Sequence, residues 1–64
     1  MTALSSRLSK IFIEAKDGNG VLHRRVVFVE NWDAIPYKHQ RAMAFAYAMR
    51  LAKDFLVQWS FGRA

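Results

Sequence analysis

The sequence predicts a small α+β domain in which a two-stranded antiparallel hairpin packs on one long C-terminal helix. Two observations support this fold class. The hairpin signals DG and NG both occur in the segment Asp17-Gly18-Asn19-Gly20, between two stretches with strand-like patterns. Within residues 36–61, strong helix formers supply most positions from 40 to 56. A length of 64 residues suits one domain, so we expect residues 1–64 to form a single ββα binding domain.

The hairpin is expected over residues 9–30, after a flexible lead-in at residues 1–8. Residues 9–16 alternate in polarity, and residues 21–30 are rich in β-branched side chains. A turn loop of even length pairs odd positions of the first strand with even positions of the second, whereas an odd loop breaks this assignment. With an even loop, the core face carries Ile11, Ile13, Ala15, Leu22, Val26 and Phe28, with Arg24 as its only charge. The opposite face is then basic with an apolar strip.

The helix expected over residues 36–61 is more apolar than one hairpin can cover. Asp33 is a candidate N-cap ahead of Pro36, and no Gly or Pro interrupts residues 40–56. Apolar side chains occupy roughly half of the helix circumference, although a stripe of about 100° is enough to cover one core. We expect the hairpin to pack on the stripe formed by Ala44, Ala48, Leu51 and Phe55. The remaining apolar flank is expected to meet a second chain.

Composition excludes several kinds of site. The chain has no Cys, and its two His and five acidic residues lack the spacing of metal ligands, so we expect no disulfide, metal or cofactor. No segment approaches the ~18 consecutive apolar residues of a transmembrane helix. The N-terminal residues lack the apolar core of a secretory signal, and we therefore expect a cytoplasmic protein.

Catalysis is not expected either. General acid–base chemistry needs titratable groups that converge in a pocket. The aspartates are instead expected in separate places, with Asp17 in the turn, Asp33 at the helix cap and Asp54 on the solvated helix face. The sequence therefore predicts a binding protein that is not an enzyme.

Protein binding is the function that explains most of the sequence. Hydrophobic residues make up 53% of the chain and aromatic residues 14%, more than so small a domain can bury by itself. Aromatic, Met and Arg side chains are enriched at interface cores. The candidate partner-binding residues are Arg41, Phe45, Met49, Leu56 and Trp59. We expect a regulator or inhibitor of a larger protein target that also forms a homodimer.

Nucleic-acid binding is the alternative. Ten Lys and Arg residues against five Asp and Glu give a formal net charge of +5, which favours an acidic partner. A two-stranded ribbon fits the major groove of DNA. The candidate nucleic-acid-binding residues are Lys10, Phe12, Lys16, His23 and Arg25, all on the outer face of the expected hairpin. A helix lying on an anionic membrane surface is a third interpretation.

Overall fold

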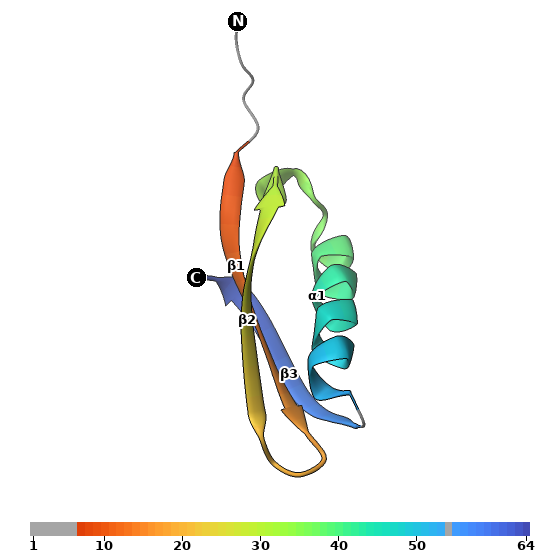
Figure 1. The fold of residues 1–64 in the computed structure, drawn as a ribbon. Helices are drawn as coiled ribbons and strands as arrows, with labels where there is room; N and C mark the ends of the chain where they lie inside the picture. Colours follow the sequence, from red (N-terminus) through yellow and green to blue (C-terminus); the bar gives the residue numbers. More distant parts are fainter. Residues whose placement is uncertain (1–6, 54) are drawn as a thin grey trace, which may run out of the picture.

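The computed structural model describes residues 7–53 and 55–64 and shows a three-stranded antiparallel sheet covered on one face by one helix (Figure 1). The elements are β1 (Leu8–Asp17), β2 (Leu22–Glu30), the 3-10 helix η1 (Trp32–Ala34), α1 (Tyr37–Ala52) and β3 (Leu56–Arg63). The strand order is β2-β1-β3, so β1 is central and both other strands are edges. The α+β class is confirmed. The two-stranded sheet is wrong, because the end of the chain adds a third strand.

A three-residue turn sets the register of β1 and β2. The Asp17 amide donates to the Val21 carbonyl at 3.0 Å, and the Gly20 amide donates to the Asp17 carbonyl at 3.0 Å. Gly20 has a φ of 81°, the left-handed conformation that suits glycine at the end of such a loop. The Asp17 carboxylate also accepts hydrogen bonds from the amides of Asn19 and Val21, at 2.9 and 3.0 Å. The loop Gly18–Gly20 is therefore odd in length.

The odd loop reverses the faces expected for β2. Ile11 pairs with Val27 and Ile13 with Arg25, so odd positions pair with odd positions. Because successive side chains of a strand alternate between faces, one step of register moves every β2 side chain to the other face. Leu22, Val26 and Phe28, expected in the core, lie on the face away from α1. The side chains on the α1 face of β2 are His23, Arg25, Val27 and Val29.

The helix ends nine residues before the expected end, because α1 stops at Ala52 and not at Phe61. Lys53 has a φ of 56° and a ψ of −72°, which turns the chain out of the helix. The following strand β3 pairs with β1 in antiparallel register, with Ile13 opposite Phe61. Alternation of Trp59 and Phe61 with polar or small residues is a strand pattern, but the i, i+4 spacing of Phe55 and Trp59 concealed it.

The core lies between β1 and α1. Ile11, Ile13 and Ala15 of β1 are buried against the alanines of α1. The buried helix residues are Ala44, Ala48 and Ala52. Their small side chains let the helix backbone approach the sheet closely, as expected for Ala44 and Ala48. Phe55, expected in the same stripe, lies beyond the helix and is exposed.

The remaining expectations concern the ends of elements. Asp33 is not the N-cap of α1, because Pro36 occupies that position and Asp33 lies in η1, where it pairs with Arg63. The expected lead-in falls mostly on residues 1–6, outside the described residues, but Leu8 already belongs to β1. The expected solvated position of Asp54 also lies outside the described residues.

We predict that Lys53→Gly stabilises the protein by about 1 kcal/mol. A positive φ is costly for lysine and not for glycine, and this saving exceeds the extra conformational entropy that glycine loses on folding. Urea unfolding measures the change. A continuous helix through this position would give the opposite sign, a loss of ~1 kcal/mol. Arg50→Gly, three residues earlier and inside α1, is the matched control and should destabilise the protein by about that amount.

A second prediction concerns pH. The hydrogen bond from His23, at 2.9 Å, and those from the Val21 and Asn19 amides lower the pKa of Asp17 below 3.8. A carboxylate whose pKa is lowered by folding stabilises the protein above its unfolded pKa, and this contribution is lost as the pH falls through the folded value. Unfolding free energy should therefore fall more between pH 5 and pH 2 in the wild type than in Asp17→Asn, which keeps an oxygen acceptor for the turn. Equal slopes would contradict the prediction.

Candidate functional site

A chain of aromatic rings lies along the α1-facing side of β3. The side chains of Trp59 and Phe61, two residues apart, both lie on that side, and their rings stack with centroids 5.9 Å apart and planes 14° apart. Phe61 also contacts Tyr37 of α1 at 6.0 Å and Trp32 of η1 at 6.1 Å. Trp59 contacts Phe45 of α1 at 5.4 Å. The rings therefore join η1, α1 and β3, and we name this set the aromatic cluster.

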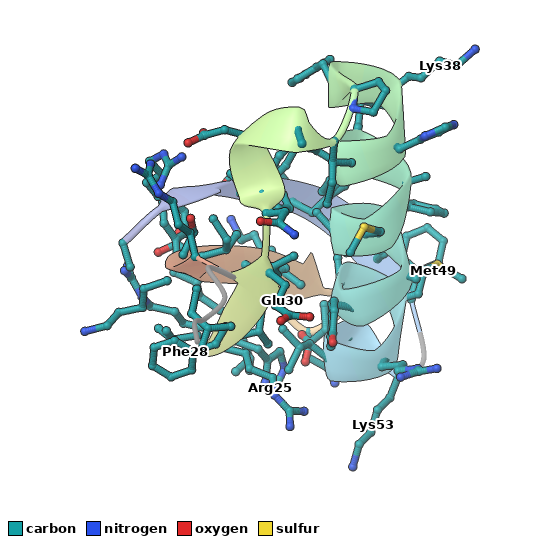
Figure 2. The ribbon with its side chains drawn as sticks, turned by 90° about the horizontal axis from the view of Figure 1, so that it is seen from above. Arg25, Phe28, Glu30, Lys38, Met49 and Lys53 are labelled. Carbon is teal, nitrogen blue, oxygen red and sulfur yellow. The ribbon has the colours of Figure 1, made fainter. Side chains whose placement is uncertain are left out.

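Arg41 lies between the two helix aromatics of this cluster. Tyr37, Arg41 and Phe45 are spaced four residues apart, so they share the flank of α1 that lies toward β3. The Arg41 guanidinium carbon is 5.0 Å from the centroid of the Trp59 ring, a cation–π arrangement. Met49 continues the same flank one turn later and is 51% exposed. Figure 2 shows the Met49 side chain pointing outward from α1.

Three of the five predicted partner-binding residues are thus in contact, namely Arg41, Phe45 and Trp59. Leu56 and Trp59 are not on the helix where they were expected, because both belong to β3. Leu56 is half-buried against the core. Sequence reasoning missed Phe61, whose period-2 spacing from Trp59 was the available signal.

The free edge of β3 runs beside this cluster. The Ala64 amide donates to the Lys10 carbonyl at 2.9 Å, so the even residues of β3 bond to β1. Antiparallel ladders alternate, and the amides and carbonyls of Trp59 and Phe61 therefore point away from β1. No strand of the described chain pairs with this edge.

The β3 edge has few of the features that usually discourage strand pairing, apart from one extra residue near its start, where the register shifts opposite Lys16 and Asp17. Natural edge strands are blunted by charged residues, Pro or bulges. From Leu56 to Gly62, β3 carries no charge and no Pro. The β2 edge differs, since it carries Arg24 and Arg25. We name as the β3-edge surface this free edge together with the adjoining flank of α1, formed by Tyr37, Arg41, Phe45, Met49, Trp59 and Phe61.

The predicted nucleic-acid residues do not share one face. Lys10, Phe12 and Lys16 point away from α1, whereas His23 and Arg25 lie on the α1 side of β2. The odd turn loop is the reason. His23 and Arg25 instead border a hollow that Asp17, Arg50, Leu51, Ala52 and Lys53 also line. Arg25 and Lys53 lie at the same end of the molecule in Figure 2.

Arg24, which sequence reasoning did not select, lies with Lys10, Phe12 and Lys16 on the face away from α1. Its guanidinium carbon is 4.8 Å from the Phe12 ring centroid, and its Nη1 donates to the Glu14 carboxylate at 2.9 Å. The face therefore carries a positioned cation that the expected register had assigned to the core.

Within residues 7–53 and 55–64, no cluster of three or more His, Asp or Glu side chains is placed to hold a metal ion. No helix in that part of the chain is long and apolar enough to cross a membrane.

We predict that Phe45 and Trp59 are energetically coupled. In a double-mutant cycle with Phe45→Ala and Trp59→Ala, the coupling should be about 0.5–1.5 kcal/mol in unfolding free energy at one fixed protein concentration. Phe28 lies on the other face of the sheet, so Phe28→Ala and Trp59→Ala should be additive. Coupling of equal size in both cycles would contradict a direct contact between the two rings.

No protein family model, curated protein or solved structure matches this chain.

Proposed function

We propose that this chain is a protein-binding module that self-associates by pairing β3 with β3 of a second copy. The observation that carries the proposal is the free edge of β3, uncharged from Leu56 to Gly62, beside exposed apolar side chains of α1. Tyr37 is 66% exposed and Phe45 42% exposed, although both belong to the aromatic cluster. Contiguous exposed apolar surface of this kind marks interaction sites.

A second copy is the partner that fits this edge by symmetry. Antiparallel pairing about a two-fold axis at Ser60 places Trp59 of each copy opposite Phe61 of the other, with their free amides and carbonyls facing. Cross-strand aromatic pairs stabilise such a contact. Pairing through β2 would instead place Arg24 and Arg25 of both copies in the interface, and charged residues on an edge strand disfavour pairing.

Self-association also suits the size of the domain. Small domains bury a low fraction of their surface, and oligomerisation is one way to bury more. In a β3–β3 dimer both helices lie on the same face of a continuous sheet, so the flanks carrying Phe45 and Met49 face each other. Arg41, the only charge on the β3-edge surface, already lies over the Trp59 ring. The role of a cytoplasmic regulator or inhibitor of a larger protein is part of this proposal and rests on the sequence argument alone.

The proposal predicts a concentration-dependent dimer that one backbone methyl group disrupts. Sedimentation equilibrium from low to high micromolar concentration should give a dimer mass for the wild type. A chain of this length can be synthesised chemically with a methyl group on the Phe61 nitrogen, which removes an outward-facing donor but keeps the ladder with β1. This variant should be monomeric while its circular dichroism remains that of the wild type.

The matched control carries the methyl group on the Val26 nitrogen. The Asn31 amide donates to the Arg7 carbonyl, so odd residues of β2 bond to β1 and the Val26 amide faces the free edge of β2. This control should remain dimeric. A monomeric wild type at high micromolar concentration would overturn the proposal, as would a dimer that is lost only in the Val26 control.

A further inference from the structure

The second face of the sheet is uncovered and unusually apolar. In Figure 2, Phe28 points away from α1, and no element of the described chain packs over that side of the sheet (Figure 1). Phe28 is 64% exposed and Leu22 62% exposed. A solvated face of an antiparallel sheet normally carries polar side chains. We name this side, which carries Lys10, Phe12, Glu14, Lys16, Leu22, Arg24, Val26 and Phe28, the open sheet face.

Phe12 and Arg24 form a fixed stack at the centre of the open sheet face. The Phe12 ring lies against Gly62 of β3, where a Cβ atom would come within 3.0 Å of Phe12 Cε2. Gly62 therefore leaves the space in which the ring packs against the β3 backbone. Arg24 lies over the ring, and its ion pair with Glu14 at 2.9 Å holds it there. The planar guanidinium group is thus positioned before any ligand arrives.

Cations and apolar side chains are interleaved across β1 and β2. Lys10 is the cross-strand partner of Phe28, and Lys16 is the cross-strand partner of Leu22. Phe28 lies four residues from Arg24 on β2, roughly 13 Å along the strand. Lys10 and Lys16 lie six residues apart on β1, roughly 20 Å. The Phe28 ring and the Arg24 guanidinium therefore each have a cation nearby, and the spacings match the length of a short oligonucleotide.

The chemistry of this face selects among possible ligands. A protein packed over it would bury Lys10 and Lys16, which have no acidic partner within salt-bridge distance, and such burial is costly. A duplex offers phosphates but keeps its bases stacked, so it cannot use the exposed Phe28 ring. Unpaired bases stack on aromatic rings and on guanidinium planes, and their phosphates bind Lys. Glu14 does not oppose this, because it is engaged with Arg24.

We propose that the open sheet face binds single-stranded nucleic acid. Bases stack on Phe28 and on the guanidinium of Arg24, while Lys10 and Lys16 contact phosphates. Glu14 and Gly62 are positioning residues, since they hold Arg24 and Phe12 in place. The net charge of +5 adds a long-range attraction to the polyanion. This site is separate from the β3-edge surface and does not depend on self-association.

The test is fluorescence anisotropy with labelled single-stranded oligo-dT and oligo-U and with a DNA duplex of equal length, over a series of salt concentrations. We expect tighter binding to the single strands. Phe28→Ala should weaken that binding by about 5- to 150-fold, the range for loss of one stacked base. Lys10→Ala and Lys16→Ala should each reduce the salt slope by about 0.7.

Adjacent arginines supply the matched control. Arg24→Ala and Arg25→Ala remove the same charge from neighbouring positions of β2, but only Arg24 lies on the open sheet face. We expect a clear loss of affinity for Arg24→Ala and little change for Arg25→Ala. Circular dichroism of each variant establishes that the fold is retained, and Leu22→Ser replaces Phe28→Ala as the test of the face if that variant unfolds.

Several results would overturn the proposal. One is the absence of single-strand binding at low salt. Another is equal loss of affinity in the two arginine variants, which would indicate general attraction to a basic chain. A third is loss of self-association in Phe28→Ala without any effect on nucleic acid, which would make the face a protein interface. Binding of single strands that persists in the monomeric N-methyl-Phe61 chain would support the proposal, because the open sheet face would then bind nucleic acid without self-association.

Discussion

The close contact between β1 and α1 is the interaction on which the rest of the structure depends. Its buried side chains are few and mostly small, with Ile11 and Ile13 the only large ones that are fully buried. Because Ala44, Ala48 and Ala52 fill little volume, the helix lies near the sheet and the core between them is thin. Trp32 is buried, but the aromatic side chains of Phe45, Trp59 and Phe61 lie on the β3 side of α1, where they are only partly covered. A thin core and a partly exposed aromatic cluster thus have one cause.

The second constraint is the parity of the hairpin turn. The three-residue loop places Val27 and Val29 over the core and sends Leu22, Val26 and Phe28 to the open sheet face. The same step of register moves Arg25 to the α1 side and brings Arg24 over Phe12. The chemistry of both sides of the sheet is therefore decided at Gly18–Gly20, where one residue more or fewer would exchange them.

These two constraints explain what could be predicted from the sequence. The hairpin was accessible because its turn signals and its β-branched strand are local features. The loop length was not, because DGNG allows loops of two and of three residues, and the choice sets every face of β2. The strand β3 was missed for a different reason. Its Trp59, four residues after Phe55, also fits the helical stripe of α1, and only the pairing with β1, far away in the sequence, favours the extended form.

The candidate site was partly predictable for the same reason. Arg41, Phe45 and Trp59 were selected by residue type and do come together, but through a strand folded back onto the helix and not through one continuous helix. The predicted nucleic-acid-binding residues were placed on one face, and this was wrong for His23 and Arg25, two of the five, because their placement depended on the strand register. Predictions based on residue type alone were therefore less affected by the strand pairing than predictions that required the pairing to be known.

The two proposed surfaces are geometrically compatible. The β3-edge surface uses the edge of the sheet and the α1 side, whereas Phe28 and Lys10 lie on the other side. A two-fold axis perpendicular to the sheet, as antiparallel pairing of β3 requires, places both open sheet faces on the same side of one continuous sheet. A single strand that crossed both faces would gain from two linked sites, and its affinity would rise without any new contact. Dimerisation through the edge would in this way extend the surface available to nucleic acid without covering any part of it.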